Sequence, residues 1–243
     1  MNRLLQKANR LLDLIYPATC HLCHCPLTHG RHLCEPCGES LHYIEAPFCS
    51  RCGECFDGKI DDVFICPNCH GLELDFEFAR AALHSEGDGR TLVHDFKYRR
   101  QIYLADELGR LIKTALDDPR FQPYLDRGIL VPVPLHWLRL RKRKFNQSEE
   151  IAASLAKITS LTLVNALKRI RNTETQTRFS RAKRLENLAE AFEVRKKYQS
   201  HIHGREIILV DDVFTTGSTA NECAKLLMKH GASRVAVLTL LRG

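Results

Sequence analysis

The sequence predicts an α/β protein with a mostly parallel sheet and flanking helices, preceded by a small Cys-rich metal-binding module. In the C-terminal two-thirds, short apolar runs alternate with stretches of helical spacing, which is typical of a parallel sheet. Ten of the eleven cysteines fall between Cys20 and Cys69, in a segment that has no sustained apolar periodicity. Because such a segment cannot bury much apolar surface, we expect metal ions to hold its fold.

The elements of the larger part follow in order from the apolar spacing. A strand is expected over 78–83, a turn over 85–88 and helices over 88–97 and 104–116. Residues 117–126, with two prolines, predict a loop, and residues 128–134 a short buried strand that runs into a loop. Asn146 and Glu149 predict a capped helix to about residue 158. The remaining expectations are a strand over 161–164, a long loop over 170–185, a strand over 207–210, a helix over 219–230 that ends at Gly231, and a strand over 234–241.

The N-terminus predicts an amphipathic helix over residues 1–19, because its leucines and isoleucine repeat on one helical stripe. Polar residues interrupt it too often for a signal peptide, and no apolar run of the chain is long enough to span a bilayer. We therefore expect a cytoplasmic protein with three parts: the helix at 1–19, a metal-binding module at 20–71 and an α/β domain at 75–243.

The cysteines form four Cys-x-x-Cys pairs. A two-residue spacer lets both sulfurs of a pair bind one ion, and two pairs supply the four thiolates of a closed tetrahedral zinc site. Disulfides are disfavoured because there is no secretion signal. We expect one or two structural zinc ions, whose loss unfolds the module and spares the α/β domain. The expected ligands are Cys20, Cys23, Cys34 and Cys37, and then Cys49, Cys52, Cys66 and Cys69, with interleaved pairing left open.

Residues 207–219 place two acids and a polar loop directly after an apolar strand. Asp211 and Asp212 follow the strand at the end where open α/β sheets bind ligands, and ionised carboxylates suit the hydroxyls of a ribose. The loop of Thr215, Thr216, Gly217, Ser218 and Thr219 leads into a helix, whose first N–H groups attract anions. Either half alone is more simply a turn or a helix cap. Together they predict a sugar 5-phosphate site.

Residues 207–219 resemble the signature with which type I phosphoribosyltransferases bind phosphoribosyl pyrophosphate (PRPP). The resemblance implies that fold, ribose hydroxyls on Asp211 and Asp212 as the candidate catalytic residues, the 5-phosphate on the 215–219 loop, and Mg²⁺ held mainly by PRPP. In that family pyrophosphate leaves C1 through an oxocarbenium-like state, which the enzyme stabilises by positioning and charge.

The wider order of motifs resembles the ComF/GntX family from residue 20 to residue 243. It runs from the Cys-x-x-Cys pairs through Phe96-Lys-Tyr98, Val131-Pro-Val-Pro134, Phe145-Asn-Gln147 and Arg171-Asn-Thr173. This chain has Arg143-Lys-Phe-Asn146 where the family has Arg-Gly-Phe-Asn. The resemblance implies a role in natural competence, in which incoming single-stranded DNA passes the inner membrane to the recombination machinery.

The positive charge of the chain is concentrated in one stretch. The formal net charge is +7, and residues 136–205 hold 17 Lys and Arg against 6 Asp and Glu. This predicts a polyanionic partner. Two interpretations of the cations compete, and both can hold together: contact with pyrophosphate, and contact with a DNA backbone, with Phe145 or Trp137 as stacking platforms. A solvated charged face is the simplest alternative. The residues expected to contact pyrophosphate are Lys97, Arg139, Arg141, Arg143 and Arg184.

Three functions fit these features. The favoured one is a competence protein that binds PRPP with Mg²⁺ and single-stranded DNA, with phosphoribosyl transfer left open. The others are a base-salvage phosphoribosyltransferase and a PRPP sensor that binds nucleic acid without turnover. The metal module favours the first over the second. Expected partners are PRPP, single-stranded DNA, and DNA-uptake channel or recombination proteins, with peripheral association at the inner membrane as an option.

Overall fold

The computed structural model of the protein describes residues 18–27, 30–56, 58–60, 63–172 and 190–243. They form two compact units, divided between His42 and Tyr43. The helix expected at 1–19 lies outside the described residues except for its last two, and so does most of the loop expected over 170–185, with Arg184. None of the helices in the described ranges is long and apolar enough to cross a membrane.

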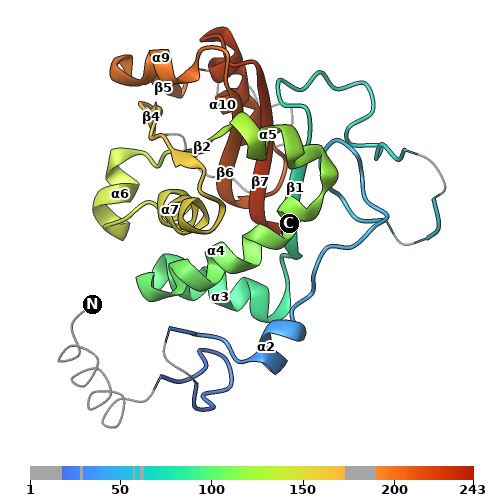
Figure 1. Ribbon diagram of the computed structural model, residues 1–243, viewed down its shortest axis with the longest axis vertical. Coiled ribbons are helices and arrows are strands. Elements are labelled where there is room, and N and C mark those ends of the chain that lie inside the picture. The colour runs from blue at the N-terminus through green and yellow to red at the C-terminus, as the bar shows by residue number, and fades with distance from the viewer. Residues whose placement is uncertain (1–17, 28–29, 57, 61–62, 173–189) are drawn as a thin grey trace. The chain divides into compact units, whose positions relative to one another are not determined.

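The larger unit is built on a five-stranded parallel sheet (Figure 1). The strand order is β1-β7-β6-β2-β3, and every neighbouring pair runs parallel. The central strands are apolar on both faces, as a sheet covered by helices requires. The α/β class is therefore confirmed. The strands are β1 (Ala79–His84), β2 (Ile129–Pro132), β3 (Thr162–Leu163), β6 (Glu206–Phe214) and β7 (Arg234–Arg242).

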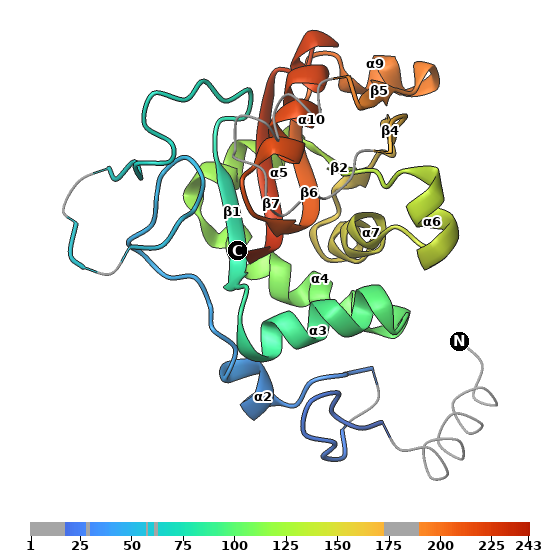
Figure 2. The same ribbon diagram turned by 180° about the vertical axis from the view of Figure 1, so that it is seen from behind.

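Helices cover both faces of the sheet (Figures 1 and 2). Helices α4 and α7 pack against each other and against the sheet, whereas α10 lies on the opposite face. Opposite faces follow from right-handed crossovers, because the chain moves from β2 to β3 in one direction along the sheet and from β6 to β7 in the other. The long helices are α3 (Gly87–Tyr98), α4 (Ala105–Lys113), α7 (Gln147–Thr159) and α10 (Ser218–Lys229).

Shorter elements complete the described chain. Strands β4 (Leu167–Arg169) and β5 (Phe192–Val194) form a separate antiparallel pair. Helix α6 follows β2 and carries the most basic run of the chain. The short helices are α2 (Glu35–Glu39), η1 (Ile102–Leu104), η2 (Thr114–Asp117), η3 (Pro119–Phe121), α5 (Gln122–Arg127), α6 (Trp137–Arg143), η4 (Lys196–Tyr198) and α9 (Gln199–Ile202).

Two local predictions are wrong. The loop expected over 117–126 is mostly helical, because Pro119 and Pro123 each stand in a first helical turn, where proline has no hydrogen bond to lose. Asn146 does precede α7, but its side chain does not cap the helix. Its amide Nδ2 donates instead to the Val133 carbonyl at 3.1 Å, which ties α7 to the end of β2.

The second set of cysteines belongs to the larger unit. Cys49, Cys52, Cys66 and Cys69 are 0–4% exposed and share a hydrophobic core with Phe76 and Phe214 and with the α10 side of the sheet. The division at His42 and Tyr43 thus precedes this set, whereas the expected boundary lay between residues 71 and 75. The physical reason is that these cysteines occupy core positions of the α/β unit.

Candidate functional site

The two acids lie where β6 extends beyond one of its neighbours. Strand β6 pairs with β2 only as far as Val210 opposite Pro132, but with β7 as far as Phe214 opposite Arg242. The residues that follow Val210 therefore have a paired neighbour on the β7 side and an open edge on the β2 side. Asp211 and Asp212 stand at this edge, at the carboxyl end of the sheet, as expected for a ligand site in an open α/β fold.

Asp211 is held by hydrogen bonds from two elements. Its Oδ1 accepts from the Ser148 hydroxyl of α7 at 2.8 Å and from the Asp212 backbone N–H at 2.9 Å. Burial, followed by the charge of Asp212, raises the pKa of Asp211 to about 7, against these hydrogen bonds and the charge of Lys97. The carboxyl therefore changes protonation near neutral pH.

Asp212 pairs with a cation from a distant part of the sequence. The Lys97 Nζ of α3 lies 2.6 Å from the Asp212 Oδ2. The side chains of Lys97 and Asp212 are 15% and 14% exposed. Because α3 and β6 are more than a hundred residues apart, only the fold brings this ammonium to the acids. Lys97 was among the expected cations, and it contacts a predicted acid directly.

The Thr215–Thr219 loop turns directly into α10. Gly217 has a φ of +75°, and a Cβ added there would lie 2.6 Å from the Phe214 ring. Both facts require glycine. Helix α10 begins at Ser218, and its N-cap, Gly217, offers no side chain to the first N–H groups of the helix. The Thr216 and Ser218 hydroxyls lie 2.9 Å apart. A backbone turn of this kind offers several donors to one anion.

The remaining predicted cations are distributed along α6. Arg139 is half-buried, and its charge reaches Arg169 beside the acids. The Arg143 guanidinium contacts Tyr98, with Nη2 3.5 Å from the phenol oxygen and the guanidinium carbon 5.2 Å from the ring centroid. Arg141 is exposed. The structure therefore places Arg139 within electrostatic range of Arg169, and Arg143 beside the exposed ring of Tyr98.

Several residues near the acids were missed by the sequence reasoning. Burial and then the charge of Arg139 lower the pKa of Arg169, whereas Cys223 and Asp211 raise it, so this guanidinium lies close to the candidate site. Gln147 is 1% exposed, and within the described ranges its Nε2 has no hydrogen-bond partner. Buried polar groups of this kind are usually satisfied by a ligand or water. The available signal was Gln147-Ser148 at the first turn of a helix after an apolar strand.

The raised pKa of Asp211 predicts a pH dependence of stability. In the folded protein this carboxyl keeps its proton up to about pH 7, whereas in the unfolded chain it loses it near its ordinary value of 3.8. Between these pH values the folded state binds more protons than the unfolded chain. The contribution of Asp211 to the free energy of unfolding therefore falls as pH rises from about 4 to about 7. Urea unfolding at pH 5 and 7.5 should show a smaller decrease for Asp211→Asn than for wild type. Identical decreases would contradict the raised pKa.

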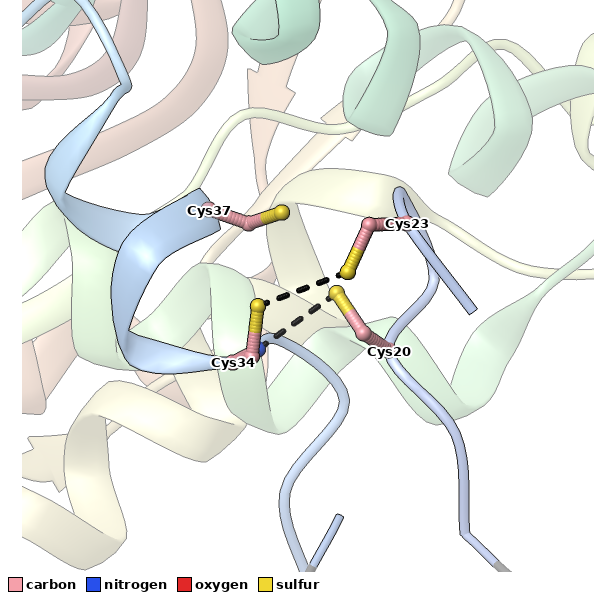
Figure 3. A group of neighbouring side chains, drawn as sticks. All are labelled: Cys20, Cys23, Cys34 and Cys37. Atoms are coloured by element: carbon pink, nitrogen blue, oxygen red, sulfur yellow. Dashed lines mark hydrogen bonds between the residues drawn. The ribbon is translucent and has the colours of Figure 1, made fainter. Parts of the chain in front are cut away.

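The first cysteine set has the geometry of a zinc site. Figure 3 shows the sulfurs of Cys20, Cys23, Cys34 and Cys37 directed toward one another. All four sulfurs lie within 4.8 Å of each other, and those of Cys23 and Cys34 are 3.6 Å apart. A tetrahedral ion with Zn–S bonds of about 2.3 Å places its sulfurs about 3.8 Å apart. The donor set therefore fits a structural zinc ion.

The second set repeats this geometry. Its four sulfurs also lie within 4.8 Å, with Cys52 and Cys66 3.6 Å apart. In each set the first sulfur accepts a backbone N–H from the third cysteine: Cys34 to Cys20 at 3.4 Å, and Cys66 to Cys49 at 3.3 Å. Such donors stabilise thiolates. Burial is the largest single influence on the pKa values of Cys20 and Cys49, and it raises them. Several hydrogen bonds together outweigh burial, so the pKa of Cys20 is lowered to about 6 and that of Cys49 to about 7.

The pairing within each set follows the order of the sequence, since the first two pairs form one set and the last two the other.

The backbone hydrogen bonds show which position the extra cysteine, Cys25, occupies. Its carbonyl accepts from the Cys20 N–H at 2.8 Å, as the Glu54 carbonyl accepts from the Cys49 N–H at 2.7 Å. Cys25 thus occupies the position that Glu54 has in the second set, where no metal ligand is needed.

A parallel sheet with two acids and a glycine-containing polar loop at its carboxyl edge defines a phosphoribosyltransferase-type domain, here joined to two Cys₄ sites. Residues 146–243 match the phosphoribosyl transferase domain, and residues 11–70 match the double zinc ribbon domain. Competence protein F of Haemophilus influenzae is 32% identical over 213 residues, which are 86% of this chain and 90% of that protein. The chain therefore belongs to the ComF/GntX family.

Two further relatives extend the match over almost the whole chain. The DNA utilization protein YhgH of Escherichia coli K12 is 31% identical over 94% of this chain and 99% of its own length. Competence protein ComFC of Bacillus subtilis is 27% identical over 96% of this chain and 88% of its own length. The likeness thus includes the cysteine sets and the α/β domain together.

Proposed function

We propose that this protein binds PRPP with Mg²⁺ at the carboxyl edge of its sheet and single-stranded DNA on a neighbouring surface, as part of DNA handling in natural transformation. The observation that carries the proposal is the juxtaposition of Asp211 and Asp212 with Lys97, at the open edge of β6 and beside the Thr215–Thr219 loop. This arrangement matches the parts of PRPP: two acceptors for the ribose hydroxyls, and backbone donors for the 5-phosphate.

The roles of the individual residues follow from their chemistry. We assign the ribose 2′- and 3′-hydroxyls to Asp211 and Asp212, and the 5-phosphate to the loop and the first turn of α10. Pyrophosphate would lie toward Arg139 and Arg169, whose guanidinium groups can form charge-assisted hydrogen bonds with its oxygens. Mg²⁺ would be held mainly by oxygens of PRPP. Asp211 accepts a hydrogen bond from a ribose hydroxyl best when its carboxyl is ionised, so PRPP should bind more tightly above pH 7 than below it.

Calorimetric titration with PRPP and Mg²⁺ tests this proposal directly. We expect saturable binding that weakens when Mg²⁺ is removed, and weaker binding of ribose 5-phosphate, which lacks the pyrophosphate. If neither PRPP nor ribose 5-phosphate gives binding heat, and neither competes with the other for the protein, the proposal is overturned. A parallel assay of pyrophosphate release with purine and pyrimidine bases separates turnover from sensing. Release with one base favours a transferase, whereas binding without release favours a PRPP-responsive DNA-binding protein.

The nucleic-acid part of the proposal is supported by the surface of α6. Trp137 of α6 is 58% exposed, and Tyr98 at the end of α3 is 62% exposed. Arg141 and Lys142 of α6 are exposed as well. Arg100 donates to the Lys142 carbonyl at 3.0 Å, which joins the end of α3 to α6. Exposed rings among cations are what single-stranded DNA requires. Phe145, the other predicted platform, is 6% exposed and packs on Phe96 with ring centroids 5.1 Å apart, so that prediction is wrong.

Replacing Trp137 tests this surface. We expect Trp137→Ala to weaken binding of a labelled dT₂₀ oligonucleotide about 5- to 150-fold, because stacking contributes about 1–3 kcal/mol per base. Arg141→Ala should lower the slope of log affinity against log salt by about 0.7, the value for one phosphate contact with a single strand. Met228→Ala, which removes an exposed apolar side chain from α10, is the control. Equal affinities of all three variants and wild type, measured by anisotropy, would exclude α6 as the DNA-binding surface.

The cellular setting is also part of the proposal. Free thiols poised to bind zinc are characteristic of a reducing compartment, which favours the cytoplasm. We further propose that the protein works at the inner membrane with DNA-uptake channel or recombination proteins. Pull-down of those proteins by the tagged full-length chain from competent cells, with a Trp137→Ala control, tests whether the contact depends on shared DNA.

A further inference from the structure

The second cysteine set and the Thr215–Thr219 loop lie against the same core residues. Phe214, the residue before the loop, is 3% exposed and belongs to the core cluster that contains all four cysteines. The loop lies directly on its ring, because a Cβ at Gly217 would approach that ring to 2.6 Å. Any displacement of Phe214 therefore moves the loop.

Arg242, at the end of β7, joins the two features. Its Nη1 donates to the Phe214 carbonyl at 3.3 Å and to the Thr215 carbonyl at 3.0 Å. Its Nη2 contacts the Glu54 carboxylate and lies 3.9 Å from the Cys52 sulfur. The planar guanidinium can make these contacts at once because its donors point in fixed, different directions. The side chain is only 10% exposed.

A second connection runs from the other end of the cysteine set. Six residues after Cys69, the Asp75 backbone N–H donates to the Asn221 side chain at 2.8 Å, and the Asn221 amide donates back to the Asp75 carboxylate at 3.3 Å. The next residue, Phe76, packs edge-on against Phe214 with ring centroids 6.0 Å apart. The first turn of α10 is thus tied to the segment that leaves the cysteines.

We propose that Arg242 is a positioning residue, which couples metal occupancy of the second cysteine set to sugar-phosphate binding by the Thr215–Thr219 loop. The inference rests on the proposed function, since the ligand is a sugar 5-phosphate. A bound ion holds Cys52 and Cys69 at fixed separation, and with them Glu54 and Phe76. Arg242 and Phe76 then hold Phe214, and through it the loop. Without the ion the four sulfurs are held only by packing and by weak hydrogen bonds such as that from the Cys66 N–H to Cys49, and the support of the loop weakens on both sides.

Coupling of this kind is reciprocal. If the metal strengthens sugar-phosphate binding, a sugar phosphate must strengthen metal binding by the same factor. Ribose 5-phosphate should therefore slow the loss of zinc from the second set about fivefold or more, the usual range of such couplings. It should not slow the loss from the first set, which belongs to the other compact unit.

Zinc release measures this effect without an assay of activity. The full-length protein is mixed with a chromophoric chelator, with and without ribose 5-phosphate, and the phase from the second set is identified in a Cys20→Ser/Cys23→Ser variant. We expect Arg242→Gln to retain zinc but to lose the effect of ribose 5-phosphate, and Arg242→Lys to restore part of it. Arg234→Gln is the matched control, because Arg234 lies at the other end of β7 and pairs with Glu206.

Hydrogen exchange separates this inference from the function on which it rests. In zinc-loaded Arg242→Gln, the amides of residues 215–219 should exchange faster than in zinc-loaded wild type, even without ligand. If wild type fails to bind ribose 5-phosphate, the proposed function is wrong, and the exchange rates still decide the coupling. Unchanged loop exchange in Arg242→Gln, or equal zinc release with and without bound ribose 5-phosphate, would overturn it.

Discussion

Loss of zinc from the second cysteine set is expected to unfold the phosphoribosyltransferase-like domain. Cys49, Cys52, Cys66 and Cys69 are buried in its core, and a structural zinc contributes about 10–16 kcal/mol in small zinc-finger peptides. The total stability of a typical domain is about 5–15 kcal/mol. Removing the ion leaves four buried sulfurs beside Phe76 and Phe214, so the cooperative unfolding transition should be strongly weakened or lost.

Paired variants measure this effect. Cys49→Ser/Cys52→Ser should lose most of the urea unfolding transition followed by far-ultraviolet circular dichroism, to which the helices of the larger unit contribute most. Cys20→Ser/Cys23→Ser is the matched control, because it removes the equivalent ligands from the smaller unit. We expect that control to keep the transition of the larger unit. A second-set variant that unfolds like wild type would show that zinc is dispensable there.

Replacement of Asp211 and Asp212 by asparagine is expected to abolish PRPP binding without unfolding the protein. A hydrogen bond to a charged group contributes about 1.5–3 kcal/mol, which corresponds to a loss of about 10- to 150-fold for each acid. The double variant should bind below detection in calorimetry. Lys97→Met should have a smaller effect than Asp212→Asn, since it removes the cation beside Asp212 but leaves the acceptor.

The same variants carry an internal control. Because burial and the charge of Asp212 disfavour ionisation of Asp211, Asp211→Asn should be at least as stable as wild type at pH 7.5. Loss of binding with unchanged stability therefore identifies a ligand role. Asp88→Asn, on the exposed start of α3, serves as the surface control. Full PRPP affinity in the double variant would exclude the two acids as ribose ligands.

Much of the framework could be predicted because its signals are local. The strand at 207–210, the helix from Thr219 and the strand from Arg234 follow from apolar spacing bounded by glycine, and the structure has all three. The four Cys-x-x-Cys pairs likewise predicted two four-sulfur groups, since chain geometry brings the two sulfurs of a pair together. The helices at Pro119 and Pro123 were missed, because proline marks the start of a helix as well as a loop.

Side chains on distant elements were harder to place. Phe145 and Trp137 are equally plausible stacking residues in a basic stretch, but α6 exposes Trp137, whereas Phe145, in the turn between α6 and α7, packs in the core against Phe96. Burial of a particular ring depends on what the segment that carries it packs against in the folded chain. Arg169 was missed for a similar reason, because its proximity to Asp211 arises only when β4 lies beside the main sheet.

The sequence by itself determined the class of fold, the family, the eight cysteines of the two four-sulfur sets and the acidic and polar segment of the candidate PRPP site, since each is written in contiguous residues or fixed spacings. Only the tertiary structure decided that Lys97 meets Asp212, that Ser148 holds Asp211, and that the second cysteine set lies in the core behind the phosphate loop. These contacts join residues about 60 to 165 positions apart, and no local pattern specifies them. They exist because the parallel strands bring their carboxyl ends to one edge of the sheet.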